Sequence, residues 1–491
     1  ARTSHAHVFI TMASWCTAAD KAALAASGLA EAAVSVLCQS HESADRRMLT
    51  VETNLASIEG LKSANNTIFL LFSTALVFFM QAGFAMLCAG SIRAKNVKNI
   101  LLKNVLDAAV GAIFWYLFGY GIAFGVPGDG NAGRFMGEAD FALGISAVGP
   151  SGGNSWIWFL FQWSFAAAAA TITSGAMAER TQFAAYLGYS ALLTGFVYPT
   201  VVHWAWDSQG WLKSVPWKKD DGDKSLAYHD FAGSGVVHMV GGFSGLMGAI
   251  MVGPRTGRFD AQGRPIAMPG HNAALVVLGT FILWVGWYGF NCGSQATAQD
   301  DADAVVIGRV GITTTLAASA GGVTSLFLNY ALYKVWDLIA VCNGVLAGLV
   351  SITAGCAVLD LYMAIFAGFI GAFVLFGSSK LLLKLRIDDP LEAFPVHGAC
   401  GMWGVLAVGL FAKEKYLGDN DNDRYGALMG GNGRLFGVQL LGVVSIILWV
   451  CGILGPFFFV LKQAGLLRTS AEEEAAGLDE SKHGGSAYNN A

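Results

Sequence analysis

Two histidines lie inside apolar stretches that are long enough to cross a membrane. An ionisable side chain is energetically unfavourable there, so these two residues are the first candidates for chemistry. His238 ends the run Asp230-Phe-Ala-Gly-Ser-Gly-Val-Val-His238, and His397 lies in Phe394-Pro-Val-His397-Gly. An ionisable side chain at membrane depth costs about 3 kcal/mol or more, so it marks a functional site by default. Because an imidazole titrates at about pH 6.5, such a pair can accept a proton and pass it on.

Other interpretations of this pair stay open. The two histidines can be unrelated buried residues, each bonded to a carbonyl, or together they can bind one haem. A metal site would need a third ligand, and none is evident nearby. His203 is expected to lie at a membrane interface, and six histidines in loops and tails are expected to be solvated: His5, His7, His41, His229, His271 and His483.

Aromatic residues gather near one end of the apolar stretches, in segments 161–165, 203–206 and 287–294. Such rings can form the aromatic belt that lies at the lipid headgroups. Alternatively, they form a vestibule that holds a cation on aromatic faces, a contact worth roughly 0.5–2 kcal/mol.

Asp230 opens the apolar stretch that carries His238. Its carboxylate is expected to cap the start of that helix by accepting hydrogen bonds from backbone N–H groups. Electrostatic support of a bound cation is compatible with this structural role.

The composition shows what kind of chain positions these residues. The 491 residues carry a formal net charge of −4, with 54% hydrophobic and 13% charged residues. The mean hydropathy is +0.52. A soluble domain has roughly 25% charged residues, so these values exclude a disordered chain and a typical soluble enzyme. Few cations and a nearly neutral charge also argue against nucleic acid as the partner. The remaining class is a polytopic membrane protein.

Eleven windows are long and apolar enough to span a bilayer. They are 68–90, 101–125, 155–178, 183–205, 230–252, 270–294, 305–333, 338–358, 361–384, 395–412 and 435–461. The first ten divide into two sets of five, and because five is odd the second set is inverted. His238 and His397 then occupy matching places near the midplane. We therefore predict an all-α polytopic membrane protein with eleven transmembrane helices, formed by two inverted five-helix repeats plus one final helix.

An odd number of spans puts the two termini on opposite sides of the membrane. The tight basic loops 93–103 and 255–264 favour the cytosol, which places the N-terminus outside, although the lysines of loop 207–229 nearly balance the count. We predict an extracellular N-terminal region over 1–65, a membrane domain over 66–462 and a cytosolic tail over 463–491. Residues 1–11 precede Met12 and are expected to be non-native, or the sequence is a fragment.

The sequence resembles the ammonium transporters of the Amt/Mep/Rh superfamily, most closely the plant and green-algal type, over about residues 66–490. Two motifs carry the resemblance, the run from Asp230 to His238 and Asp388-Asp-Pro-Leu-Glu-Ala-Phe-Pro-Val-His397-Gly. Supporting matches are Gly83-Phe-Ala-Met-Leu-Cys-Ala-Gly90, Arg93-Ala-Lys-Asn96 and Gly477-Leu-Asp-Glu-Ser-Lys-His483-Gly. The resemblance implies an eleven-span fold, a homotrimer and one pore through each protomer.

The resemblance also implies roles for residues along that pore. Trp206, Phe165 and Ser294 match an external recruitment site, and Asp230 matches the acid near it. Phe165 and Phe290 match two stacked rings that block the pore mouth.

Deeper in the same pore, Trp287 matches an aromatic residue that lines it. His238 and His397 match a hydrogen-bonded histidine pair in the lumen.

Outside the pore, the resemblance points to the two ends of the chain. Ser481 stands where plant relatives carry a phosphorylated threonine, in a motif that begins at Gly477, so a regulatory tail acted on by a kinase is expected. Cys16 and Cys38 resemble the paired N-terminal cysteines of the plant type, and a disulfide is compatible with an extracellular position.

The expected function is high-affinity uptake of ammonium across the plasma membrane. Ammonium would lose its proton near the gate, ammonia would cross the pore, and the histidines would relay the proton, with net charge carried inward. Methylammonium is a further candidate substrate. We expect no enzymatic activity, no cofactor and no metal. The alternatives are an ammonium sensor or transceptor, and a Rhesus-type channel that passes neutral ammonia or another gas.

Overall fold

The computed structural model describes residues 17–27, 30–127, 133–142, 155–217, 224–417 and 425–488. The chain separates into two compact units, Ala1–Asn65 and Asn66–Ala491. Helix α3, Glu31–Ser91, begins in the first unit and ends in the second. The two units are described separately below.

In the N-terminal unit, helix α2 spans Ala18–Ala26 and begins with a capping box between Thr17 and Asp20. This reciprocal pair of hydrogen bonds satisfies backbone groups that a short helix otherwise leaves open. Cys38 on α3 is disulfide-bonded, whereas Cys16 lies outside the described residues.

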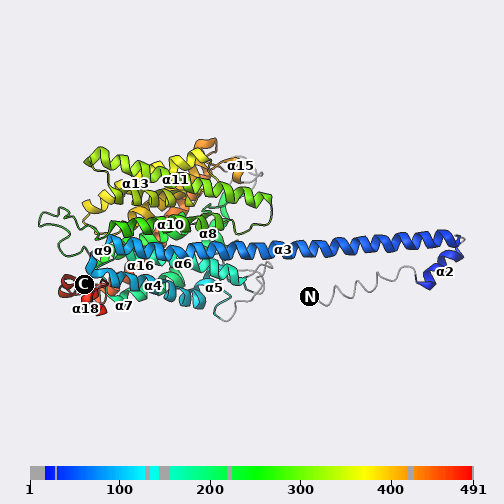
Figure 1. The fold of residues 1–491 in the computed structure, drawn as a ribbon, viewed down its shortest axis with the longest axis horizontal. Helices are drawn as coiled ribbons and strands as arrows, with labels where there is room; N and C mark the ends of the chain where they lie inside the picture. Colours follow the sequence, from blue (N-terminus) through cyan, green and yellow to red (C-terminus); the bar gives the residue numbers. More distant parts are fainter. Residues whose placement is uncertain are drawn as a thin grey trace. The chain divides into compact units, whose positions relative to one another are not determined.

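The larger unit is a bundle of helices (Figure 1). Ten helical segments of the described chain are long and apolar enough to cross a membrane, and α12 is a shorter apolar helix. Each of the eleven predicted windows coincides with one of these segments, so the all-helical polytopic fold is confirmed. Their bounds are: α4 Val97–Phe114, η2 Trp115–Gly119, α5 Tyr120–Phe124, α6 Ser155–Ala176, α7 Phe183–Leu192, η3 Leu193–Val197, α8 Tyr198–Trp206, η5 Ser234–Met239, α9 Val240–Val252, α10 Ala273–Gly293, α11 Asp301–Tyr333, α12 Leu338–Thr353, α13 Leu361–Lys384, η6 Phe394–Ala399, α14 Cys400–Phe411 and α16 Arg434–Gln463.

Four of the spans contain a π-helical turn, and two of these turns carry the histidines. His238 lies in η5 and His397 in η6, and each turn opens its span. A π-helical turn widens the helix and is frequent at functional sites. The two histidines therefore occupy equivalent local structures, as expected for the fifth and tenth spans of a repeated fold.

The two histidine-bearing spans approach each other very closely at Gly242. A Cβ atom on Gly242 would lie 2.2 Å from the backbone nitrogen of Gly398, next to His397. No side chain fits that gap, so glycine permits the backbone contact. The close approach brings the start of α9 against η6 and so positions the histidines.

Two regions differ from the simple prediction of loops and spans. The loop before the fifth span contains a two-stranded antiparallel sheet, β1 Val215–Trp217 and β2 Lys224–Leu226. The fifth span itself begins at Ser234, four residues after the predicted start, because Asp230 and Gly233 form a cap before it.

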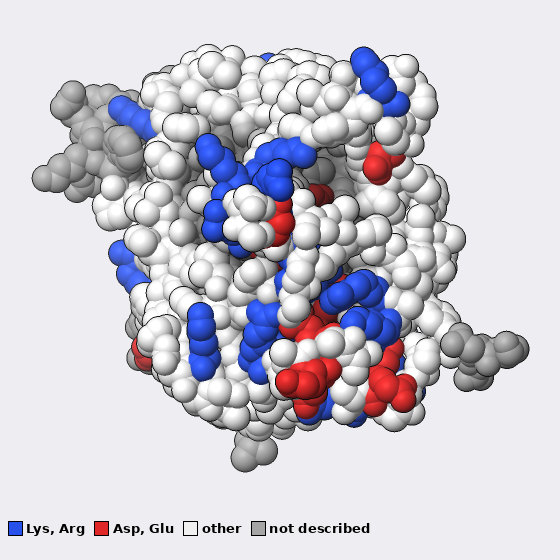
Figure 2. All heavy atoms as spheres, turned by 90° about the vertical axis from the view of Figure 1, so that its left-hand side faces the viewer, with Lys and Arg blue, Asp and Glu red and all other residues white. Residues whose placement is uncertain are grey.

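After α16 the chain forms two short helices, α17 Ala471–Ala476 and α18 Leu478–His483. Figure 1 shows this C-terminal segment, in red, beside the ends of α4 and α7. The face that carries it is rich in both Lys or Arg and Asp or Glu side chains (Figure 2). We call it the tail face, and call the opposite end, where Trp206 ends α8, the tryptophan face.

The remaining short elements lie in connections between spans. They are η1 Ala94–Asn96, η4 Trp211–Lys213, α15 Glu414–Leu417 and η7 Ala427–Met429.

Candidate functional site

His238 and His397 form a direct hydrogen bond although 159 residues separate them in the sequence. Their Nδ1 atoms are 3.1 Å apart, and both side chains are buried. One imidazole must donate and the other accept, because two N–H groups facing each other repel. The pair thus holds a single proton between its Nδ1 atoms.

The second ring nitrogen of His238, Nε2, distinguishes this pair from two merely structural histidines. Among the described residues, no protein group hydrogen-bonds to its buried Nε2 atom. Buried polar atoms normally have a partner. Nε2 is therefore available to a small ligand that can donate or accept a hydrogen bond.

A continuous row of rings leads from the histidine pair toward the tryptophan face. The ring of His238 stacks on Trp287, with centroids 5.1 Å apart, and on Phe290 at 5.4 Å. Trp287 is fixed in turn, because its Nε1 donates to Thr353 Oγ1 at 2.9 Å. The Thr353 contact was not predicted, since a threonine in an apolar helix gives no sequence signal.

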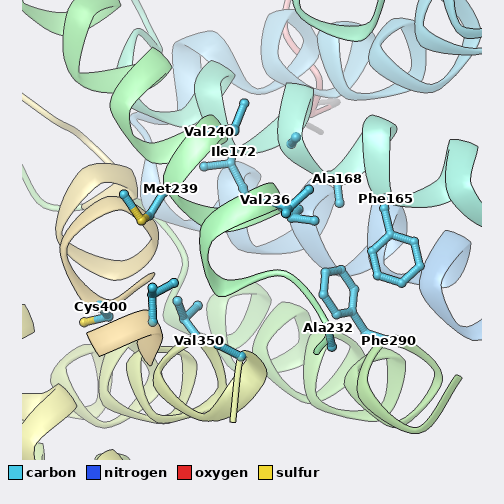
Figure 3. Close-up of a cluster of buried hydrophobic side chains, with 14 of the residues drawn as sticks. Phe165, Ala168, Ile172, Ala232, Val236, Met239, Val240, Phe290, Val350 and Cys400 are labelled. Atoms are coloured by element: carbon cyan, nitrogen blue, oxygen red, sulfur yellow. The ribbon is translucent and has the colours of Figure 1, made fainter. Parts of the chain in front are cut away.

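Phe165 and Phe290 contact each other next to the histidine pair, since Phe290 also stacks on His238. Their ring centroids are 4.3 Å apart with an interplanar angle of 46°, so the rings are tilted rather than parallel. Figure 3 shows the two rings facing each other, from different helices, beside Ala232 and Val236. Both rings are fully buried.

Trp206 lies edge-on to Phe165, with centroids 5.9 Å apart, and is partly exposed. Its Nε1 donates to the carbonyl of Asp230 at 2.7 Å, which fixes the indole plane. Ser294 ends α10, one turn beyond Phe290, and its hydroxyl donates to the Phe290 carbonyl at 2.8 Å. The Ser294 oxygen keeps lone pairs with which it can accept a hydrogen bond.

Asp230 is a backbone cap. Its carboxylate accepts hydrogen bonds from the N–H groups of Gly233, Gly235 and Val236 at 2.8–3.0 Å. These groups lie at the start of the fifth span, where a helix leaves N–H groups without partners. Through this cap, and through its carbonyl bond to Trp206, Asp230 positions both the histidine-bearing span and the tryptophan.

His203 lies outside this row of rings. His203 is fully buried, with its two nitrogens 3.0 Å from the carbonyl of Ala123 and 2.7 Å from that of Gly133. The expectation of an interfacial His203 is therefore wrong, because carbonyls from a neighbouring segment enclose the ring.

Three histidines that were expected to be solvated are not free in solvent. The Nε2 atom of His229 is buried. His271 bonds to the Ile92 carbonyl and to the Tyr488 hydroxyl. His483 Nε2 lies 2.7 Å from the Asn99 amide nitrogen. Within the described residues, no group of three or more His, Cys, Asp or Glu side chains is arranged to hold a metal ion.

A buried ion network lies at the tail face. Arg255 donates to Glu179 at 2.7 Å and to Asp388 at 2.8 Å and 3.0 Å. Burial alone would raise the pKa of Asp388, but hydrogen bonds from Arg255 and the charges of Arg180 and Arg255 hold it well below its usual range. The network joins the segments that follow α6, α9 and α13 at their shared end.

The C-terminal helices dock beside this network. Asp479 accepts from the backbone N–H groups of Lys98 and Asn99, and the Leu478 N–H donates to Asn96 Oδ1. Glu474 accepts from the N–H and hydroxyl of Thr256. The tail therefore contacts both of the loops that the sequence marks as basic.

Sequence comparison matches residues 68–488 to the Ammonium Transporter Family. The chain is 51% identical over 437 residues to "Ammonium transporter 1 member 3" of Solanum lycopersicum, covering 86% of this chain and 93% of that protein. It is 50% identical over 416 residues to "Ammonium transporter 1 member 1" of Arabidopsis thaliana, covering 82% and 81%.

Solved structures with the same fold include a "Sensor Amt Protein", with a TM-score of 0.78 and 33% identity over 87% of this chain and 100% of that chain. Another is Candida albicans Mep2, with a TM-score of 0.74 and 25% identity over 85% and 88%. With a family match over most of its length and relatives half identical to it, this chain belongs to the ammonium transporter family and transports ammonium.

Proposed function

We propose that ammonium is recruited at Trp206, Phe165 and Ser294, loses its proton near Phe165 and Phe290, and passes His238 and His397 as ammonia. The observation that carries this proposal is the hydrogen bond between the two histidines at the inner end of the ring row. It supplies a proton acceptor at the depth where a charged substrate is least stable.

The physical problem is the cost of moving an ion into an apolar medium. Ideal Born solvation puts this cost at tens of kcal/mol, which aromatic faces cannot repay alone. Deprotonation removes the charge, so the neutral molecule crosses and the proton travels separately. The unpartnered Nε2 of His238 and the shared proton between the Nδ1 atoms suit this relay.

Selectivity follows from the same chemistry. Potassium resembles ammonium in charge and size, so neither property separates the two ions. Ammonium differs because it carries hydrogen-bond donors and a removable proton. The Ser294 hydroxyl oxygen can accept from such a donor, and the histidine pair can take the proton. Methylammonium keeps both features and is a candidate substrate.

The direction of transport depends on the orientation in the membrane. We propose that the tryptophan face is extracellular and the tail face cytosolic, in the plasma membrane, with three protomers assembled as a homotrimer. The proposal includes high-affinity uptake with net inward movement of positive charge. A kinase acting on Ser481 would then meet a tail on the cytosolic side.

The experiment that tests the mechanism compares ammonium-dependent currents in oocytes that express the wild type or His238→Ala at matched surface levels. The wild type is expected to carry an inward current, and the variant to lose most of it. His271→Gln is the matched control, since that histidine lies outside the ring row. Uptake without current in the wild type would favour neutral ammonia transport instead.

A second role, ammonium sensing, is favoured by one observation. The solved structure with 33% identity is named a sensor. A signalling role for the present chain would show as an ammonium response in yeast that persists in a variant lacking ammonium uptake. Loss of the response together with uptake would leave transport as the sole role.

A further inference from the structure

The hydroxyl of Ser234 is inserted into the backbone of another transmembrane helix. Ser234 is fully buried at the start of η5, and its Oγ atom donates to the Val350 carbonyl at 2.8 Å. The same oxygen accepts from the N–H of Ala354 at 2.7 Å. These two backbone groups belong to residues four apart, the spacing at which an α-helix pairs its own N–H and C=O groups. The hydroxyl therefore stands where a backbone hydrogen bond of α12 would lie.

The insertion coincides with the end of α12. This helix ends at Thr353, the residue before Ala354. A side chain that enters the hydrogen-bond ladder of a helix is a known cause of a kink or a break. A hydroxyl from the fifth span therefore fixes the place where the regular part of the eighth span stops.

The residues just before Ser234 hold the same end of α12. The N–H of Phe231 donates to the Ala354 carbonyl at 3.0 Å, and the N–H of Ala232 donates to the Thr353 carbonyl at 3.2 Å. Together with the inserted hydroxyl, these bonds set the start of the fifth span in one register on α12. A change in any one of them moves the groups that the others hold.

Thr353 connects this junction with the row of rings. Its backbone carbonyl accepts from Ala232, while its side-chain Oγ1 accepts from Trp287 Nε1 at 2.9 Å. Trp287 stacks on His238, with ring centroids 5.1 Å apart. The end of α12 that Ser234 holds is therefore one contact away from the ring that lies against the histidine pair.

The packing around Ser234 leaves little room for its hydroxyl to move. A Cβ atom on Gly404 of α14 would lie 2.7 Å from Ser234 Oγ, and a Cβ atom on Gly401 would lie 2.5 Å from the Ser234 carbonyl oxygen. Glycine permits this close approach between the spans. The tenth span, which carries His397, thus encloses the inserted hydroxyl from the other side.

We propose that Ser234 is a positioning residue: its hydroxyl, inserted in α12, sets Trp287 against His238 and thereby the rate at which the substrate passes. Ser234 touches no substrate itself and acts through Thr353. This inference rests on the pore proposed above, in which the ring row lines the path. Because the recruitment residues lie at the other end of the row, loss of the hydroxyl should slow passage more than it weakens binding.

Two substitutions separate the hydrogen bonds of Ser234 from its packing. Ser234→Ala leaves a methyl group without the bonds, so the maximal uptake rate per surface molecule should fall about fivefold, with the Michaelis constant within twofold of wild type. Ser234→Gly leaves room for a water molecule that can bond to the same two backbone groups, so it should keep at least half of the wild-type rate. A glycine variant as slow as the alanine variant, or slower, would show that Ser234 acts by volume and would overturn the proposal.

Ser244→Ala is the matched control. Ser244 lies further along the same span and is equally buried, and its hydroxyl has no protein partner among the residues that the structure describes. Its loss should leave the rate within twofold of wild type. A slowing equal to that of Ser234→Ala would mean that any buried hydroxyl in this span matters, which contradicts a specific role for the inserted one.

A double substitution tests whether the effect passes through Trp287. Trp287→Phe removes the Nε1 donor and keeps a ring, so adding Ser234→Ala to it should change the rate by less than about twofold. Independent effects would multiply instead, and a further fivefold loss would overturn the inference. A normal rate in Ser234→Ala beside a slow Trp287→Phe would overturn the inference and leave the pore standing. Normal rates in both Trp287→Phe and His238→Ala would overturn the proposed pore, and the inference with it.

Discussion

The Asp479 carboxylate accepts a hydrogen bond from the backbone N–H of Asn99, at 2.8 Å, across 380 residues of sequence. Its other oxygen accepts from the N–H of Lys98 at 2.9 Å. Both donors lie in the first turn of α4, where helix N–H groups lack partners and the helix dipole favours a negative charge. The tail thus caps the N-terminus of a membrane helix although the two segments lie at opposite ends of the sequence. A movement of the tail would remove these hydrogen bonds from the helix bundle.

Gly477 is the position where this docking is most easily broken. Its φ is +101°, and a Cβ there would lie 2.6 Å from Lys95 Cβ and 2.7 Å from the Lys95 carbonyl oxygen. Gly477→Ala is expected to reduce transport about tenfold and to expose the tail to protease. Gly485→Ala is the control, because its φ of +106° is similar but the nearest atom to the new Cβ, Glu480 Oε2, lies 3.7 Å away. Similar losses in the two variants would attribute the effect to backbone strain alone.

Ser481 is expected to act as a switch on the same docked segment. Its hydroxyl donates to the Gly477 carbonyl at 2.8 Å. A phosphate adds about −1.5 to −2 charges beside Asp479 and Glu480 and cannot make that hydrogen bond. Ser481→Asp should therefore lower transport several-fold at unchanged surface abundance, whereas Ser481→Ala should remain active. Equal uptake by the two variants would show that Ser481 is not the switch.

The histidine pair should decide what crosses the protein. His238→Ala and His397→Ala each remove one half of the 3.1 Å contact, and each is expected to reduce ammonium transport at least tenfold. An acidic residue at either position is expected to keep flux but admit potassium, because a fixed negative charge favours hydrated cations. Normal uptake and selectivity in both alanine variants would refute the proton relay.

Trp206 should set affinity rather than maximal rate. Losing one cation–π contact of about 1–2 kcal/mol raises the apparent Michaelis constant about five- to thirty-fold. Trp206→Leu in an uptake assay tests this. Trp204→Leu is a suitable comparison, since Trp204 packs on Trp211 and Trp449 instead of Phe165. An unchanged Michaelis constant in Trp206→Leu would place that ring in a purely structural role.

Acid should loosen the docked tail through His483. Burial lowers the pKa of His483, while Asp479 raises it and Lys103, Lys98 and Lys482 lower it. The docked state thus favours the neutral ring. Neutral His483 stabilises the docked tail fully above the free pKa of about 6.5, and this stabilisation is lost as the pH falls below that value.

Hydrogen exchange of α18 between pH 7.5 and 5.5 measures this effect. Protection is expected to fall in the wild type and to change less in His483→Gln. Glu474 should not contribute in this range. Burial raises its pKa, but hydrogen bonds from Thr256 and Arg468 outweigh that effect and hold the pKa below its usual value. An equal loss of protection in both proteins would assign the pH response to another group.

The sequence by itself determined the class of the fold and the depth of the histidines. Long apolar windows set the spans because unpaired backbone groups are too costly in lipid, and this holds whatever the packing. The same windows place His238 and His397 inside the membrane.

Only the tertiary structure decided which atoms meet. The Nδ1 contact between His238 and His397 depends on the backbone approach at Gly242, which no local pattern specifies. Asp230 accepts three backbone hydrogen bonds at the start of the fifth span because the chain turns at Gly233. Asp479 reached the first turn of α4 through long-range packing. Such contacts join residues far apart in sequence, so local propensity and periodicity carry no information about them.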